Sequence, residues 1–422
     1  MVMDEKVQKY IEAVCREVRN RSVHQLIRED VLGHLEEAYQ EEVDLGATHS
    51  KAVDLAIERT GDPVKLGQLF HKIHRPQVDW LAILGIVLVG AVGVIVTVGA
   101  VPSVSVATPE QDVLRTVIGL VLGMLVGAGL FFVHPGHLRR LGPYVLVGTL
   151  LLMLVTDLMG RPINGEKQLF GVHIFELCPY LLALGFADIF RRPRWLRDWR
   201  ILLLAALIAL ADLMFVHGHS NSNLILANIS IFTIALSSKL PRWKVSVGAG
   251  TFLAAMTAYV LRNRWLVERF TGAFHAQDHA YTSGFYNYQT QLFVNHAGWF
   301  GHGLGHGSFI LSFEHSTLAF AQLINMFGWC GGLLFAAVVL CIFARLFHRS
   351  QRVQNEFAQT IAFALLTLLA FQFIYPFCMG LGTFPIIGLS TPLIGGGLWT
   401  SVVALGSFGM VLGVLKRPSL QA

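Results

Sequence analysis

The chain has 422 residues, of which 54% are hydrophobic and 14% are charged. An average soluble domain carries about 25% charged residues, so this composition excludes an ordinary soluble protein. The net charge is +5, but acidic and basic residues are mixed along the amino-terminal segment, which argues against a nucleic-acid partner. The cysteines are scattered without metal or redox spacing. The sequence therefore predicts a polytopic membrane protein with no metal and no cofactor.

Residues 1–76 have the pattern of a separate soluble unit. Apolar residues recur there at helical spacing, and Ser22 is a candidate N-cap for the second helix. A later helix should end at Gly61. Another should begin at Asp62, with Pro63 in the first position, where its missing N–H does no harm. We predict a small cytoplasmic domain of short helices.

The remaining residues, 77–422, read as a membrane domain. About ten apolar segments follow one another, each near the ~20 residues that cross a bilayer as a helix. They lie at about 79–101, 113–133, 142–160, 172–190, 200–217, 222–238, 243–261, 316–345, 357–377 and 391–415. The predicted fold class is therefore all-α.

The loops between these segments alternate in charge. Every second loop is basic, for example at Arg139 and Arg140, at Arg191 and Arg192, and at Arg345, whereas the loops between them contain few Lys or Arg residues. Positive charge marks the cytoplasmic side of a membrane protein. The pattern predicts that both termini are cytoplasmic.

One loop on the opposite side, residues 262–315, is too long for a simple turn and is dense in aromatic residues. Its last part contains Gly301–Gly307, where four glycines allow the backbone to approach itself or a ligand closely. The next apolar helix then begins with a polar group whose burial needs a partner or a ligand. A plain helix cap with Ser316 is the structural alternative. The polar group consists of Glu314, His315, Ser316 and Thr317.

Other polar residues have weaker patterns. The pair His302 and His306 is separated by glycines that argue against a helix, so we expect no metal site there. Acidic residues inside apolar segments are functional hypotheses by default. They are Asp157, Glu176, Asp188 and Asp212. The Gly/Pro-rich segment 380–397 should be sheltered by protein or line a cavity.

Several motifs in order resemble one family. Gln289–Gly303 is similar to a loop motif with paired glycines, and Ser312–Ala321 is similar to L-P-E-x-H-T-D-F-I-F-A with one residue deleted. Gly382–Gly397 and Asn164–Gly165 resemble two further motifs. Together they resemble the SEDS family, the FtsW/RodA/SpoVE cell-wall and cell-cycle proteins. Residues 1–76 resemble a permease-prefix domain.

The resemblance implies a ten-helix fold with a large outer loop and the polymerisation of lipid II into glycan strands. It places the family's catalytic aspartate at Thr317, where threonine cannot act as a carboxylate base, so Glu314 or Asp278 would have to replace it. The implied catalytic positions are Glu314, His315 and Thr317. The implied substrate-binding positions are Gln289, Gly301, Gly303, Pro392 and Gly396. At the external end of the seventh span, Arg262, Arg264 or Arg269 is expected to attract the diphosphate of the lipid-linked sugar.

Two functions stay open at this point. The first is handling of the lipid-linked peptidoglycan precursor in division, cell-shape maintenance or sporulation, as a peptidoglycan glycosyltransferase. The second is a catalytically inactive scaffold, precursor binder or lipid-linked precursor transporter of the same fold. An unrelated permease, suggested by the prefix, is a third reading that the ordered motifs oppose. The resemblance also implies a bacterial plasma membrane location and a class B penicillin-binding protein as partner, besides membrane lipids.

Overall fold

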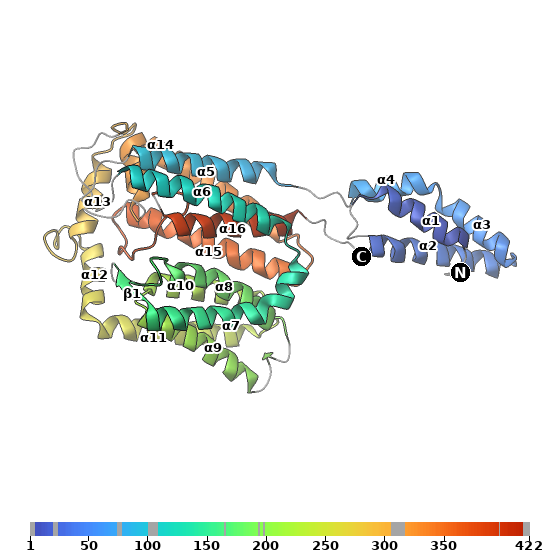
Figure 1. The fold of residues 1–422 in the computed structure, drawn as a ribbon, viewed down its shortest axis with the longest axis horizontal. Coiled ribbons are helices and arrows are strands. Elements are labelled where there is room, and N and C mark those ends of the chain that lie inside the picture. Colours follow the sequence, from blue (N-terminus) through green and yellow to red (C-terminus); the bar gives the residue numbers. More distant parts are fainter. Residues whose placement is uncertain are drawn as a thin grey trace. The chain divides into compact units, whose positions relative to one another are not determined.

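The computed structural model describes residues 5–19, 24–73, 78–99, 109–163, 166–192, 195–196, 199–304, 317–395 and 397–416. The chain forms two compact units. One is Met1–Val78 with Leu415–Ala422, and the other is Asp79–Val414. Both consist mainly of helices (Figure 1).

The amino-terminal unit contains four short helices: α1 (Glu5–Glu17), α2 (His24–Asp44), α3 (His49–Thr60) and α4 (Pro63–Ile73). Gly61 ends α3 with φ 93°, and the Asp62 carboxylate accepts the Val64 N–H at 2.9 Å at the start of α4. Both boundaries agree with the sequence prediction, whereas Ser22 lies outside the described residues. The apolar stripes meet in one core of Val7, Tyr10, Val14, Ile27, Val31, Leu35, Val53 and Ala56.

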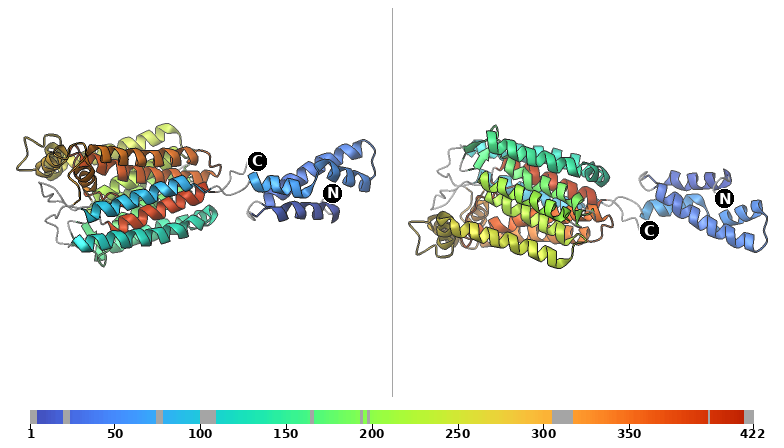
Figure 2. Two further views of the ribbon diagram at one scale, coloured as in Figure 1. Left: turned by 90° about the horizontal axis from the view of Figure 1, so that it is seen from above. Right: turned by 90° about the horizontal axis from the view of Figure 1, so that it is seen from below.

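The second unit is a bundle of apolar helices that run side by side (Figures 1 and 2). Within the described residues, eight are long and apolar enough to cross a membrane. These are α5 (Trp80–Val98), α6 (Pro109–Phe132), α7 (Pro135–Met159), α9 (Arg200–His217), α11 (Arg242–Arg262), α14 (Ala319–Ser350), α15 (Glu356–Gly380) and α16 (Leu398–Leu415). The chain is therefore a multi-pass membrane protein.

Two shorter helices, α8 (Ile174–Ile189) and α10 (Asn221–Leu236), occupy the remaining two predicted segments. Both are enclosed by protein, since α8 packs against α7, α10 and α15, and α10 also packs against α15. Every predicted segment holds a helix, which confirms the polytopic all-α fold. One short antiparallel hairpin, β1 (Arg161–Ile163) and β2 (Glu166–Gln168), joins α7 to α8.

The chain between α15 and α16 is not helical. The predicted last segment begins at 391, whereas α16 begins only at Leu398, because Pro385 and Pro392 cannot continue a helix. Residues 381–397, which we call the break, turn back into the bundle. They bury Ile386, Leu389, Leu393 and Ile394. As the sequence suggested, this irregular backbone is sheltered by protein.

Glycines allow the last helix to pack closely on its neighbours. A methyl group at Gly93 of α5 would lie 1.9 Å from the Leu393 carbonyl oxygen in the break. On α6, a methyl group at Gly127 would lie 2.6 Å from the Leu405 carbonyl, and one at Gly409 of α16 would lie 2.1 Å from the Gly127 carbonyl. Small residues that bring backbones together are typical of membrane helix packing.

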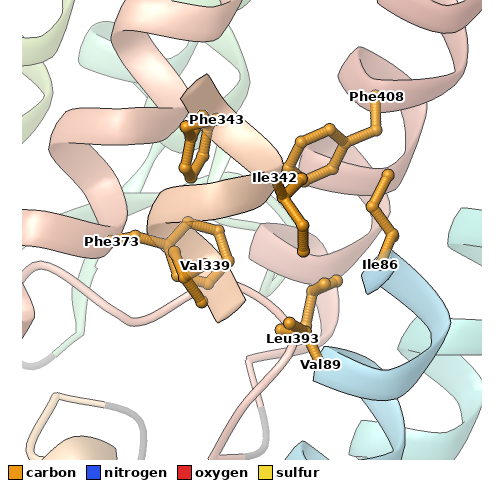
Figure 3. A pocket seen from close by; sticks show the side chains of 8 residues that line it. All are labelled: Ile86, Val89, Val339, Ile342, Phe343, Phe373, Leu393 and Phe408. Atoms are coloured by element: carbon orange, nitrogen blue, oxygen red, sulfur yellow. The ribbon is translucent and has the colours of Figure 1, made fainter. Parts of the chain in front are cut away.

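A small apolar pocket, with a free volume of only about 10 Å³, lies beside the break (Figure 3). Its walls come from α5, α14, α15, α16 and the break, and all its lining side chains are apolar. They are Ile86, Val89, Val339, Ile342, Phe343, Phe373, Leu393 and Phe408. With no polar group on its walls, this cavity cannot hold the predicted polar site.

Two buried carboxylates tie the helices together at the end opposite the large loop. Asp79, at the start of α5, accepts hydrogen bonds from Arg345 at 2.9 Å and pairs with Arg349 at 2.7 Å. Asp188, at the end of α8, pairs with Arg192 at 2.5 Å. A buried charge needs such partners to offset its desolvation. Arg192 belongs to a predicted basic loop, whereas Arg345 and Arg349 lie near the end of α14.

Candidate functional site

The described part of the large loop contains two helices, α12 (Arg264–Phe274) and α13 (Phe285–Asn295). They run across the ends of the membrane helices at one end of the bundle (Figure 1). Two buried or half-buried amides of α13 hold the break. The Asn287 amide donates to the carbonyls of Gly382 at 3.2 Å and Phe384 at 2.7 Å, and the Gln291 amide donates to the Gly382 carbonyl at 3.0 Å. The large loop and the break therefore meet at this end of the bundle.

The glycine-rich stretch after α13 pairs with the backbone of α14. His302 N–H donates to the Asn325 carbonyl at 2.8 Å, and Trp329 N–H donates to the Gly298 carbonyl at 3.0 Å. This pairing occurs where α14 is kinked, at Gly328, which has φ 69°. The freed N–H groups at the kink are thus satisfied by the loop.

Gly301 and Gly328 are required by this contact. Gly301 has φ 76°, and a methyl group there would lie 2.3 Å from the Met326 carbonyl oxygen. A methyl group at Gly328 would lie 2.2 Å from the Trp299 carbonyl oxygen. Gly303 also has a positive φ, 87°, but has open space beside it. Both predicted loop glycines therefore contact α14, since the Gly303 N–H donates to the Met326 carbonyl at 3.1 Å, but only at Gly301 would a methyl group collide with it.

Thr317, where the sequence resemblance places the family aspartate, is buried just before α14. The first turns of α14 pack on the end of α15, where the rings of Phe320 and Phe377 are 4.1 Å apart. Gln322 and Asn325, which follow on α14, are also buried. Thr317 therefore lies at the same end of the bundle as α12 and α13, close to where the break begins.

The other predicted site residues differ in position. Gln289 is half-buried on α13, between the two amides that bind the break, and Pro392 is buried within the break. Asp278 is exposed between α12 and α13. Glu314, His315 and Gly396 lie outside the described residues, as do His306, Ser316, Asn164 and Gly165.

Glu176 is a described carboxylate close to the break. Its side chain is only 20% exposed. One oxygen accepts the Thr400 hydroxyl at 3.2 Å, and the other lies 3.8 Å from His173 Nδ1. Thr400 belongs to the first turn of α16, directly after the break. The sequence signal for this residue was an acid inside an apolar segment.

The other intramembrane acids have structural partners. Asp157 pairs with Lys167 at 2.6 Å and with His217 at 2.7 Å, which fastens the β-hairpin to α7 and α9. Asp212 accepts from the Asn228 amide at 2.7 Å. These contacts explain the two acids as structural residues, and no catalytic role is needed to account for them.

Sequence reasoning missed Glu166, a residue of β2. Its carboxylate accepts hydrogen bonds from the Ser220 hydroxyl and, at 3.5 Å, from the Asn223 amide. Burial raises the pKa of the Glu166 carboxyl, although these hydrogen bonds and His173 oppose the shift. Such a group holds a proton more readily than an ordinary glutamate. The signal was weak, because Glu166 sits in a short polar turn between two spans.

Comparisons with known proteins match this arrangement. A model of the FtsW/RodA/SpoVE family, described as cell cycle protein, matches residues 77–419. The probable peptidoglycan glycosyltransferase FtsW of Marinomonas mediterranea is 22% identical over 375 residues, covering 82% of this chain and 91% of that protein. The corresponding protein of Thioalkalivibrio is 25% identical over 333 residues, covering 74% of this chain and 81% of its own length.

Two solved structures share the fold. One is a chain from a peptidoglycan synthase complex that coordinates polymerization and crosslinking, with a TM-score of 0.68 and 21% identity over 82% of this chain and 99% of that one. The other is the rod shape determining protein RodA of Thermus thermophilus, with a TM-score of 0.61 and 20% identity over 82% of this chain and 98% of that one.

Proposed function

Because the chain belongs to the FtsW/RodA/SpoVE family of cell cycle proteins, we propose that it handles lipid II at the outer face of a bacterial plasma membrane. The proposed activity is that of a peptidoglycan glycosyltransferase in division, cell-shape maintenance or sporulation. Both termini would then be cytoplasmic, and a class B penicillin-binding protein would crosslink the product. The matched relatives named as probable peptidoglycan glycosyltransferases support this activity.

One observation carries the proposal. Three segments meet at the end of the bundle that carries α12 and α13. The amides of Asn287 and Gln291 on α13 hold the break. The Gly298–Gly303 stretch pairs with the kink of α14, and the buried Thr317 precedes that helix. Long loops fixed by a rigid scaffold are where binding sites occur.

The reaction requires a base. A sugar hydroxyl of the acceptor attacks the anomeric carbon of the donor, the bond from that carbon to the diphosphate breaks, and the hydroxyl proton must pass to a base. Thr317 cannot accept that proton. Glu314 is the nearest carboxylate in sequence. Among described residues, Glu176 is the carboxylate beside the break, held by Thr400 and His173.

Thr317 also favours a second function. A member that lacks the aspartate could bind the precursor without joining the sugars, as a scaffold, precursor binder or transporter. The same outer site would serve both functions, because binding needs no base. The two functions differ only in whether the wild-type protein polymerises lipid II.

Polymerisation of labelled lipid II by the purified full-length chain tests the proposal, with and without a class B penicillin-binding protein. If Glu314 is the base, Glu314→Gln abolishes polymerisation while precursor binding persists. If Glu176 is the base, Glu176→Gln does so instead. If Asp278 is the base, Asp278→Asn does so. Glu268→Gln, at an exposed carboxylate of α12, is the matched control.

Wild-type protein that binds lipid II but makes no glycan would assign the binder function. In that case Thr317→Asp should give some polymerisation, since it returns a carboxylate to the family position. Absence of both binding and polymerisation, with and without the partner, would exclude both functions.

A further inference from the structure

The three arginines at the outer end of α11 and in α12 have different surroundings. Arg262, in the last turn of α11, is exposed. Arg264 has a side chain that is 92% exposed and forms an ion pair with Glu268 at 2.9 Å. Arg269 alone is partly buried among other elements. The structure thus separates three residues that are equivalent in the sequence pattern.

Aromatic side chains lie near the Arg269 guanidinium. Its central carbon lies 4.9 Å from the ring centroid of Trp265, one helical turn earlier, in a cation–π contact. Its charge also interacts with the hydroxyl groups of Tyr286 on α13 and Tyr375 on α15. The Tyr375 hydroxyl donates to the Pro385 carbonyl at 3.0 Å, which fixes that ring against the break.

Among the described residues, no carboxylate forms an ion pair with Arg269, in contrast to Arg264. Burial lowers the pKa of the Arg269 guanidinium, but an arginine remains charged at any physiological pH. A charge held away from water is costly unless an opposite charge approaches it. The surroundings of Arg269 are therefore suited to an incoming anion.

The depth of Arg269 indicates the source of that anion. The apolar helix α11 ends at Arg262, and α12 then turns to run across the ends of the membrane helices (Figure 1). Trp265, Phe270 and Phe274 are exposed on α12. Aromatic residues beside basic ones are typical of the headgroup level of a bilayer.

We propose that Arg269, stacked on Trp265, binds the phosphate group of a membrane lipid at the outer headgroup level. The identity of the ligand rests on the proposed function: it is the diphosphate of a polyprenyl-linked sugar. A planar guanidinium presents two parallel N–H groups to phosphate oxygens, and stacking on an aromatic ring preorganises it. Arg269 therefore acts as a substrate-positioning residue beside the break.

The test measures binding of undecaprenyl diphosphate to the full-length protein in lipid nanodiscs. Arg269→Gln should weaken that binding about tenfold or more, because it removes a charge-assisted bidentate contact. Arg269→Lys should retain only part of the wild-type binding, because lysine keeps the charge but lacks the planar guanidinium. Arg264→Gln is the matched control and should change binding less than about twofold, as expected for an exposed, paired arginine.

Equal losses in the Arg269 and Arg264 variants would overturn the proposal, since any positive charge would then suffice. Unchanged binding in Arg269→Gln would also overturn it. If excess phosphatidylglycerol removes the Arg269-dependent binding, the site takes bulk phospholipid headgroups and the isoprenoid ligand is wrong. Wild-type protein that binds the probe through Arg269 but makes no glycan would reject the enzyme function alone.

Discussion

At the residue scale, glycine determines how the end of the bundle that carries α12 and α13 is built. The sequence analysis assigned the glycines of Gly301–Gly307 to close approach of the backbone to itself or to a ligand. Gly301 contacts the backbone of α14, and its counterpart Gly328 lies inside an apolar helix where no sequence pattern marks a kink. The periodicity of a single sequence cannot show this pairing. Each glycine is required only because the other segment packs against it.

Replacing Gly328 with alanine should lower the free energy of unfolding by about 3 kcal/mol. The positive φ strains an L residue, and the new methyl group would overlap the Trp299 carbonyl. The measurement is thermal or denaturant unfolding of the purified protein in detergent. Gly148→Ala is the control, since nothing lies within 4 Å of a methyl group there. It should be neutral or add up to about 1 kcal/mol through helix propensity. Similar effects of the two changes would contradict the role of Gly328.

At the element scale, the spans were predictable and their junctions were not. Ten apolar segments predicted ten helices because length and hydropathy are local properties. The docking of α13 on the break rests on Asn287 and Gln291, two amides in a loop whose sequence shows only aromatic density. The same limit applies to Arg269, which resembles Arg262 and Arg264 until α13 and α15 are placed around it.

Asn287→Ala should release the break from α13. The side chain is buried and donates to two carbonyls, so its loss should cost about 1–3 kcal/mol. Faster hydrogen–deuterium exchange in residues 381–397 would report the release directly. Gln289→Ala serves as the control, because this half-buried residue lies on the same helix without a hydrogen bond to the described part of the break. Unaltered exchange in Asn287→Ala would show that other contacts hold the break.

At the scale of the whole molecule, charge and aromatic residues define the two ends of the membrane bundle. Asp79, Asp188 and their arginines gather at one end, where they hold α5 to α14 and support α8. The opposite end carries α12, α13 and the kink of α14. The loop-charge pattern predicted this separation, since it depends only on which side of each span is basic. Which of the two ends faces the cytoplasm is a separate question, and only the loop charges predict the answer.

That orientation can be tested by labelling single cysteines in spheroplasts with a membrane-impermeant maleimide. Tyr281 is 96% exposed between α12 and α13, so Tyr281→Cys should react before lysis if this end faces outward. Glu37, on α2 of the amino-terminal unit, has a side chain that is 82% exposed. Glu37→Cys should react only after permeabilisation, because residues 1–76 are predicted to be cytoplasmic. The native cysteines must first be replaced, since Cys330 and Cys341 are exposed on the bundle surface. Labelling in the reverse order would place Arg269 and the break on the cytoplasmic side, and neither the polymerisation of lipid II at the outer face nor the proposed phosphate site could then stand.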